Sequence, residues 1–471
     1  MISQIFTSLI QINNLFNEER YEIYLVGGCV RDMIMGQEIK DYDLTTNATP
    51  KQMIEMFNKH NIVYYPTGEK YGTVTVLIDD IPFEITTYRA DGKYSDGRRP
   101  DNVVFSSSLE DDLARRDFTM NAMAILLDDF IASKYAYDIL LPSIIDPFNG
   151  IEDIKNETIK AIRDPNERFR EDGLRILRAI RFAIKYEFKI DKDTMNAIWK
   201  NHSYLDNVSI ERIQNEFNQM LLYFNRSDYS FNLSDKFQYK YSLMSFVVKR
   251  LFPQMRELAQ TTHNSVYHLF DIFTHSLLVC SNVESTLPLK LAALFHDIGK
   301  VECKTYDEEK LTNHFYHHAK VSADIAAEIL HKFRYSNDII SNVITLILVH
   351  DNELKNNKKS IKRLLSKVDE NQFYKLLDLK LADRLNHLGV NTVKKEIEYF
   401  NNIKDTYKEI KNSNEIFSIK DLAINGNDLK KLGFEEGPYI GKLLNDCLQE
   451  CIEHPEHNIK EYLLEYIYQR N

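Results

Sequence analysis

The sequence predicts an α+β protein, in which a head with a small mixed sheet precedes a long all-helical remainder. Up to about residue 145, short strand-like segments alternate with helical ones, whereas a period of 3.6 residues dominates from about residue 150 onward. A chain of 471 residues is too long for one ordinary core. We therefore expect four domains, at residues 1–145, 146–255, 256–400 and 401–471.

Strand and helix patterns are clearest at a few places along the chain. In the head, helices are expected at the start and at Lys51–Lys59, and the expected strands are Tyr21–Val26, Val74–Ile78, Phe83–Tyr88 and Ala122–Leu127. In the remainder, Glu167–Lys185 and Ile210–Phe224 are the strongest amphipathic helices, and no convincing run of strands is evident. The remainder should therefore be almost entirely helical.

Charge and composition narrow the range of possible binding partners. The formal net charge of −11 argues against a protein that coats nucleic acid non-specifically, although a local basic groove could still bind RNA. No apolar run approaches the roughly 20 residues of a membrane span, so no membrane partner is expected. The five scattered cysteines favour a reducing, cytoplasmic location, and Cys447 and Cys451 suit one face of a helix. The oligomeric state stays open.

The most informative segment of the head is Leu25–Asp32, followed by Asp41-Tyr42-Asp43. A strand that ends in Gly27-Gly28 lets backbone N–H groups approach a triphosphate closely, and Arg31 could neutralise its charge. Two carboxylates two residues apart on a strand share one face, about 6–7 Å apart. They could hold a pair of divalent ions for in-line nucleotidyl transfer.

Glu84, within Pro82–Tyr88, is a candidate third carboxylate from a neighbouring strand. The alternative is a charge that simply faces solvent. An isolated Asp-Tyr-Asp would be interpreted as an ordinary polar turn, but its position after a Gly-Gly-x-x-Arg-Asp turn favours a metal-phosphate site.

These motifs resemble those of the class II tRNA nucleotidyltransferases, the family of CCA-adding enzymes and bacterial poly(A) polymerases within the polymerase-β-like superfamily. The resemblance covers roughly the first 225 residues. It implies a polymerase-β-like head and Mg²⁺-dependent transfer of nucleotides from CTP and ATP to the 3′ end of tRNA. Asp41 and Asp43 would bind Mg²⁺, and Glu84 would join them as a catalytic carboxylate.

A second family motif stands here as Arg115–Met123. The resemblance implies that Arg116 and Asp117 recognise the ribose hydroxyls of the incoming nucleotide and that Asn121 supports the phosphate site. An aspartate that accepts from a 2′-hydroxyl would favour NTP over dNTP. The alternative, an acidic residue at a helix N-terminus with basic neighbours, would explain Asp117 alone.

Asp91–Asp101 has the glycines and charges of a mobile loop. The family has such a loop in enzymes that add the terminal A and lacks it in those that add only CC. The resemblance therefore argues against a CC-only enzyme, and an inert surface loop is the alternative.

The neck begins at Asp146–Asp153, which resembles the family's hinge motif. The family more often has glycine where Asn149 stands, but asparagine also tolerates left-handed backbone geometry. The segment Ser209–Phe217 resembles the last family motif and should support the neck.

Further along the neck, Glu171, Asp172 and Arg175 could meet on one helix edge. A carboxylate beside a guanidinium could accept cytosine and adenine, whose exocyclic donors lie next to ring acceptors, and reject guanine and uracil. The resemblance assigns this role to Asp172 and Arg175, and we add Arg178 to the nucleotide-binding set. Taken alone, the Glu-Asp-x-x-Arg pattern would indicate only a helix edge with solvent-exposed salt bridges.

A second constellation lies in the body, where Leu291–Lys300 is an apolar segment that carries His296-Asp297. It resembles the signature of HD-domain phosphohydrolases, which implies a metal site with the ligands His275, His296, Asp297 and Asp383. His318 and His350 are candidates for a second metal. Imidazoles with carboxylates suit a divalent ion such as Mg²⁺, Mn²⁺ or Ni²⁺, which would activate water against a phosphoester. Alternatively, the domain serves mainly as an RNA-binding body.

In the tail, Gly426–Gly433 and Gly437–Gly441 suit short turns at helix ends that approach a phosphate backbone. Contact with tRNA is expected, with a plain helical cap as the alternative. The resemblance favours CCA addition, but poly(A) polymerase and A-only addition share the motifs. A more distant alternative is a protein that acts chiefly as an HD phosphohydrolase.

Overall fold

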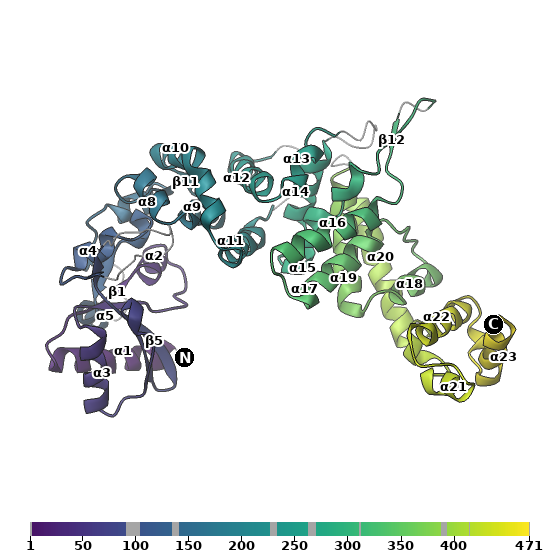
Figure 1. The fold of residues 1–471 in the computed structure, drawn as a ribbon, viewed down its shortest axis with the longest axis horizontal. Coiled ribbons are helices and arrows are strands. Elements are labelled where there is room, and N and C mark those ends of the chain that lie inside the picture. The colour runs from purple at the N-terminus through teal and green to yellow at the C-terminus, as the bar shows by residue number, and fades with distance from the viewer. Residues whose placement is uncertain are drawn as a thin grey trace. The chain divides into compact units, whose positions relative to one another are not determined.

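The computed structural model describes residues 2–90, 104–133, 141–226, 233–261, 270–309, 312–387, 393–413 and 415–470. The chain forms two compact units, residues 1–220 and 221–471 (Figure 1). The loop at Asp91–Asp101 lies outside the described residues.

The first unit contains a seven-stranded mixed sheet with the order β3-β4-β5-β2-β1-β8-β9. β1 pairs antiparallel with β2 and β8, whereas β2 and β5 run parallel. Two further strand pairs, β6 with β7 and β10 with β11, lie outside this sheet. The strands of the first unit are β1 Ile23–Val26, β2 Leu44–Thr46, β3 Tyr64–Gly68, β4 Thr73–Ile78, β5 Ile81–Thr87, β6 Arg89–Ala90, β7 Val104–Phe105, β8 Ala124–Leu126, β9 Ile144–Ile145, β10 Thr158–Ile159 and β11 Lys189–Ile190.

The helices around this sheet include α3, which begins with a capping box between Thr49 and Gln52 and has Pro50 in its first turn. Helix α11 contains the point at which the two units divide. The helices that begin in the first unit are α1 Ile2–Glu18, α2 Gly28–Ile34, α3 Pro50–Lys59, α4 Leu109–Ala114, α5 Leu127–Ser133, α7 Gly150–Lys155, α8 Pro165–Glu171, α9 Leu174–Tyr186, α10 Lys192–Asn201 and α11 Ile210–Tyr223.

The four expected head strands are confirmed as β1, β4, β5 and β8, and the two expected helices as α1 and α3. The expectation of one helix over Glu167–Lys185 is wrong, because α8 ends at Glu171 and α9 begins at Leu174. A Cβ added at Gly173 would lie 2.6 Å from the carbonyl oxygen of Tyr204. The close packing of Gly173 fits this break between the two helices.

The second unit is helical apart from the small β12–β13 hairpin in the part that the structure describes. Helices α14 to α17 and α19 pack around a core that includes Leu277, Leu294 and Leu346, all buried. The elements of this unit are α12 Asp235–Leu251, α13 Gln254–Leu258, α14 Ile272–Asn282, α15 Leu287–Phe295, β12 Thr305–Asp307, β13 Thr312–His314, α16 His318–Lys332, α17 Asn337–His350, α18 Lys358–Leu365, α19 Glu370–Leu385, α20 Val393–Asn412, α21 Gly426–Lys431, α22 Pro438–Glu453 and α23 Lys460–Arg470.

The last three helices have a small core of their own. Leu429 of α21 and Leu463 of α23 pack with Cys447 and Cys451 of α22. Both thiols are buried on the same face of α22, as expected, and all five cysteines are free. Of the helices described, none is long and apolar enough to cross a membrane.

Candidate active site

The turn between β1 and α2 brings the backbone into the candidate site. Gly27 has a φ of +75°, which side chains other than glycine rarely adopt. A Cβ at this position would also lie 2.6 Å from Nη1 of Arg116. Glycine is therefore favoured at position 27 by its backbone conformation, and Gly28 then begins α2.

The acidic residues lie beside this turn, at the edge of β2 and β5. The carbonyl oxygen of Asp43 accepts a hydrogen bond from the Val26 backbone N–H at 3.1 Å. Asp41 and Asp43 were expected on a strand, but β2 begins only at Leu44, so both lie just before it. Strands β2 and β5 are parallel neighbours, with Leu44 opposite Ile85. Glu84 precedes Ile85 as Asp43 precedes Leu44, so the two acidic residues lie at the same level of the sheet.

The three carboxylates line one cleft. Asp41, Asp43 and Glu84 are all exposed and surround a cavity of about 450 Å³. A second cavity of about 280 Å³ shares Asp43 and Glu84 and is also lined by the arginines Arg89, Arg115 and Arg116. Acidic and basic side chains thus face the same space, as binding of a metal–triphosphate complex requires.

The charges of this cleft favour a cation. Although Asp43 is exposed overall, partial desolvation inside the cleft raises the pKa of its carboxylate. The like charges of Glu84 and Asp41 raise it further, whereas Arg116 acts in the opposite direction. A divalent ion would relieve this repulsion between carboxylates, and carboxylate oxygens are ligands that Mg²⁺ prefers. The residues present therefore fit a magnesium site.

Next to the glycine turn, a continuous polar network joins α2 to the neck helix α9. Nη1 of Arg31 donates to Oδ1 of Asn121 at 2.6 Å, and Nδ2 of Asn121 donates to Oδ1 of Asp117 at 2.9 Å. Nε of Arg178 donates to Oδ2 of Asp117 at 2.7 Å. The structure thus brings together four residues from three segments that the sequence analysis singled out separately.

The electrostatics of this network hold Asp117 as a carboxylate. Burial opposes its ionisation, but Arg178 and Asn121 outweigh burial and lower the pKa of Asp117 to about 2. The guanidinium of Arg31 also lies over the rings of Phe182 and Tyr186 on α9. Both ends of the network are therefore fixed before any ligand binds.

Asp112 was missed by the sequence analysis, although it lies at the centre of the arginine group. Its buried Oδ1 accepts from Nε and Nη2 of Arg115 at 2.8 and 2.6 Å and from the backbone N–H of Arg89 at 3.2 Å. Its Oδ2 accepts from Nη2 of Arg116 at 3.3 Å. A buried carboxylate three and four residues before two arginines on a helix is the signal that could have identified it.

Replacement of Asp112 with asparagine is expected to weaken nucleotide binding, because three residues that line the cleft share this carboxylate. Hydrogen bonds to charged groups contribute roughly 1.5–3 kcal/mol, so we expect KM for the nucleotide to rise about tenfold or more, with a smaller change in kcat. Steady-state incorporation kinetics measure both. The matched control is Asp111→Asn, at an exposed neighbour whose carboxylate accepts from Ser106 Oγ. A lower melting temperature with unchanged KM would show that Asp112 is only structural.

The expected pairing of Asp172 with Arg175 is not what the structure shows. Arg175 donates to Oε2 of Glu171 at 2.6 Å and to the backbone carbonyls of Arg168 and Arg115. Asp172 instead accepts from both terminal nitrogens of Arg212, at 3.2 and 2.7 Å. The break between α8 and α9 places Asp172 outside a continuous helix, so the i,i+3 geometry does not apply.

The hinge segment adopts the geometry that was expected for it. Asn149 has a φ of 60° in the left-handed region. Both Asp146 oxygens accept backbone N–H groups, from Gly150 at 2.7 Å and from Ile151 at 2.9 Å. Asn149 thus adopts the left-handed backbone geometry that asparagine was expected to tolerate here.

In the second unit, buried histidines converge on one point. Nδ1 of His296, His318 and His350 each lies within hydrogen-bond distance of the carbonyl oxygen three residues earlier. That bond fixes the proton on Nδ1 and leaves Nε2 free as a ligand atom, as in many protein metal sites. His275 instead directs its Nε2 towards Oδ1 of Asp383 at 2.9 Å.

Asp297 lies between these histidines. Its Oδ2 is 3.3 Å from Nε2 of His296 and 3.8 Å from Nε2 of His275. Its Oδ1 is 3.4 Å from Nε2 of His318 and 3.8 Å from Nε2 of His350. Within the described part of the chain, two sets of these side chains lie close enough together to hold a metal ion. One set is His275, His296 and Asp383, and the other is His296, Asp297 and His350.

The state of these groups fits metal binding. His296 Nε2 and both Asp297 oxygens are buried without a well-oriented hydrogen bond among the described residues. Burial lowers the pKa of His275 to about 4, so its imidazole is neutral, as a metal ligand must be. Burial opposes ionisation of Asp297, but His296 and Lys300 hold its pKa well below the usual range.

Two further residues of this cluster were missed. Nζ of Lys300 lies 2.7 Å from Oδ2 of Asp297. His387 lies 3.3 Å from Oδ1 of Asp383, and its ring stacks on that of His275 with centroids 4.8 Å apart. The i,i+4 spacing from Asp383 to His387 was the signal available in the sequence.

Three family matches cover most of the chain. Residues 23–160 match the poly A polymerase head domain, and residues 187–231 match the probable RNA and SrmB-binding site of polymerase A. Residues 304–467 match the tRNA nucleotidyltransferase domain 2, which is itself described as putative. Together with the sheet and its carboxylate cleft, these matches define a nucleotidyltransferase.

Comparison with individual proteins narrows this class. The CCA-adding enzyme of Ligilactobacillus salivarius is 31% identical over 461 residues, which cover 98% of this chain and 95% of that protein. The CCA-adding enzymes of Lactobacillus helveticus and Enterococcus faecalis are 40% and 44% identical, but these alignments span only 51% and 48% of those proteins. The chain belongs to the CCA-adding enzyme family.

Solved structures agree on the fold. The Bacillus stearothermophilus CCA-adding enzyme, crystallised in complex with CTP, has a TM-score of 0.62 at 23% identity, with 99% of this chain and 97% of that chain covered. A CCA-adding enzyme in complex with ATP has a TM-score of 0.55 at 21% identity, with 99% and 93% covered. The fold is therefore shared over the whole length of the chain.

Proposed function

We propose that this protein adds C, C and A from CTP and ATP to the 3′ end of tRNA. The observation that carries the proposal is the cleft of Asp41, Asp43 and Glu84 beside the Gly27 turn, in a chain that aligns along nearly its full length with a CCA-adding enzyme. In each step the 3′-hydroxyl oxygen bonds to the α-phosphorus and pyrophosphate leaves.

The residues of the cleft divide this work. Asp41 and Asp43 would hold Mg²⁺, which when bound lowers the pKa of the attacking hydroxyl and neutralises the triphosphate. Glu84 adds the third carboxylate. Gly27 and Gly28 let the backbone approach the phosphates, and Arg31 supplies positive charge beside them.

The neighbouring network would select the sugar and the base. Arg116 and Asp117 recognise the ribose hydroxyls, and Asn121 supports the phosphate site, held in place by Arg31. Asp172 and Arg175 distinguish cytosine and adenine from guanine and uracil, and Arg178 holds the Asp117 carboxylate. Arg212 orients the Asp172 carboxylate by a bidentate pair.

Replacement of Asp172 with alanine is expected to relax base selection. The change removes the acceptor for the exocyclic amino groups, and a lost partner in a buried site costs roughly 1–3 kcal/mol. We expect kcat/KM for CTP and ATP to fall about 10- to 100-fold, so that discrimination against UTP and GTP narrows by the same factor. Single-nucleotide incorporation assays measure this ratio. Asp193→Ala, at an exposed residue of α10, is the control; unchanged discrimination in Asp172→Ala would contradict the assignment.

We assign nucleotide transfer to residues 1–145, base selection to 146–255, the histidine–aspartate cluster to 256–400 and tRNA contact to 401–471. Purified protein with Mg²⁺ and single nucleotides tests the main function on an unstructured RNA and on three tRNA substrates, which end at the discriminator base, at C or at CC. Stepwise use of CTP, CTP and ATP is expected. Activity on the CC end alone would indicate A-only addition, and long A tracts on an unstructured RNA would indicate a poly(A) polymerase.

We also propose a second activity for the cluster around Asp297, as an HD-type phosphohydrolase of damaged or cyclic RNA 3′ ends. The convergence of four Nε2 atoms on the two Asp297 oxygens supports this proposal. His275, His296, Asp297 and Asp383 would hold one divalent ion, and His318 and His350 a second. The bound ions would activate a water molecule, whose oxygen bonds to phosphorus as the ester oxygen leaves. Inertness towards 2′,3′-cyclic phosphates and nucleotide monoesters with Mg²⁺, Mn²⁺ and Ni²⁺ would exclude it.

A further inference from the structure

Helix α18 lies within a segment that is rich in lysine and arginine, although the formal net charge of the chain is −11. Residues 355–367 contain six cationic side chains and no acidic one. None of these residues belongs to the cleft of the first unit or to the histidine–aspartate cluster. The six residues are Lys355, Lys358, Lys359, Lys362, Arg363 and Lys367.

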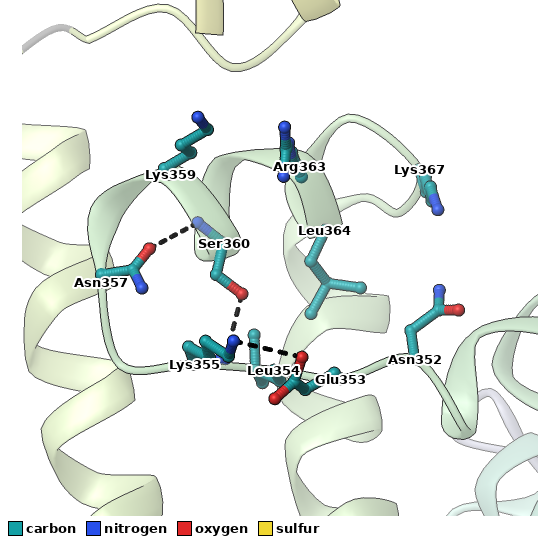
Figure 2. Close-up of a pocket in the computed structure, with 10 residues that line it drawn as sticks. All are labelled: Asn352, Glu353, Leu354, Lys355, Asn357, Lys359, Ser360, Arg363, Leu364 and Lys367. Atoms are coloured by element: carbon teal, nitrogen blue, oxygen red, sulfur yellow. Dashed lines mark hydrogen bonds and ion pairs between the residues drawn. The ribbon is translucent and has the colours of Figure 1, made fainter. Parts of the chain in front are cut away.

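Four of these cations line a cavity of about 390 Å³ (Figure 2). Asn357 caps α18 by accepting from the Ser360 backbone N–H at 2.8 Å, and Ser360 Oγ accepts from the Lys355 backbone N–H at 3.0 Å. These bonds fold the preceding loop against the helix. Figure 2 shows Lys359 and Arg363 projecting from the same side of this turn. We call this site, lined by Lys355, Lys359, Arg363 and Lys367, the α18 cleft.

The α18 cleft keeps an excess of positive charge after its internal pairs are counted. Lys358 and Lys362 share Glu415, and Lys359 and Arg363 share Glu453 of α22. Lys355 lies 3.3 Å from Glu353, where both side chains are exposed. Two carboxylates, Glu353 and Glu453, thus oppose the four cations that line the cleft. Exposed ion pairs contribute little stability, so the cations on the rim can exchange carboxylates for other anions at low cost.

The lining of the α18 cleft favours a phosphate backbone over a peptide. Among the residues that line it, only Leu354 and Leu364 are apolar, and both are buried below the surface. A peptide partner normally needs an exposed apolar or aromatic anchor. Spaced cations with asparagine and serine donors are instead the usual contacts to phosphate oxygens.

We infer that the α18 cleft binds successive phosphates of an RNA backbone. The inference rests on the proposed function, because the substrate of that function is an RNA. It adds a contact surface in the second unit, on helix α18, that lies outside the tail segment expected to touch tRNA. The same surface would hold RNA during every step of addition, since it contacts phosphates and not bases.

The double variant Lys355→Gln/Lys367→Gln tests the inference, because both side chains are exposed and neither supports the core. We expect the affinity for tRNA, measured without nucleotide at about 150 mM salt, to fall about five- to tenfold. The slope of log K against log salt should decrease by about 1 to 2, since each phosphate contact contributes about 0.9. Incorporation at saturating tRNA should keep its kcat. The control Lys394→Gln/Lys395→Gln removes the same charge from exposed positions of α20.

A second variant has the opposite expected effect. Glu453→Gln removes the carboxylate that Lys359 and Arg363 share, so tRNA should bind about two- to fivefold more tightly and with a steeper salt dependence. Unchanged affinity in both variants would overturn the inference, as would an equal loss in the control pair. The inference would also be overturned if Lys355→Gln/Lys367→Gln lost binding to phosphatidylserine vesicles while its affinity for tRNA stayed unchanged. Salt-dependent tRNA binding without any CCA addition would reject the proposed function and leave the α18 cleft in place.

Discussion

Asp43→Asn is expected to lower nucleotide incorporation by at least about 10³-fold while tRNA affinity stays within about twofold. The change keeps the size of the side chain and the carbonyl that bonds to Val26, but it removes one negative charge from the proposed metal site. Metal ions contribute several kcal/mol to stabilisation of the transition state, and each 1.4 kcal/mol corresponds to a factor of ten. Single-turnover incorporation on a CC-ended tRNA measures the loss.

The matched control for this variant is Asp80→Asn. Asp80 is exposed in the turn between β4 and β5, and its φ of 62° is one that asparagine tolerates. The control should retain full activity. If Asp43→Asn kept incorporation within about threefold of the parent, the assignment of Asp43 to the metal site would be wrong. A parallel loss of tRNA affinity would mean that Asp43 supports the fold and not the chemistry.

Asp297→Asn is expected to abolish the proposed phosphohydrolase activity, again by about 10³-fold or more, and to leave CCA addition intact. Asp297 belongs to the ligand group with His296 and His350, and its Oδ1 also lies 3.4 Å from Nε2 of His318, so one amide substitution removes the negative charge that these histidines surround. Bound metal should fall as well, and this can be measured by equilibrium dialysis with Mn²⁺ or Ni²⁺ independently of any assay. Asp324→Asn, at an exposed residue of α16, is the control.

Two results would contradict this account of the second unit. Metal binding that is unchanged in Asp297→Asn would show that the cluster is not a metal site. Loss of CCA addition together with metal would show that the ions support the fold needed for transfer. In both cases the histidine–aspartate cluster would have a structural role in an RNA-binding body.

Much of the head could be predicted because local rules decide it. Gly27 has a positive φ, which glycine adopts readily, and α3 begins with the N-cap Thr49 followed by Pro50. The residues themselves therefore indicate both the turn and the helix start. Strands β1, β4, β5 and β8 have enough apolar alternation to be recognised. β2 and β3 were missed because β2 has three residues and β3 contains a proline, Pro66.

The details of the site depend on contacts between distant segments, which the spacing of residues along the sequence does not reveal. Arg212 lies 40 residues from Asp172 and competes successfully with Arg175 for its carboxylate. Gly173, at the break between α8 and α9, packs closely against the Tyr204 backbone, a contact that the sequence around Gly173 cannot indicate. Asp112 was missed although Arg115 and Arg116 follow it at i,i+3 and i,i+4, because its third partner, the Arg89 backbone, is brought to it only by the fold.

The most direct test of the central claim is the sequence of the 3′ ends made by the purified protein. A tRNA transcript that ends at the discriminator base would be incubated with Mg²⁺ and all four nucleotides, and its ends would be sequenced. The account predicts that CCA is added and that extension then stops. Ends with A tracts of varied length, ends with G or U, or unextended tRNA would contradict it.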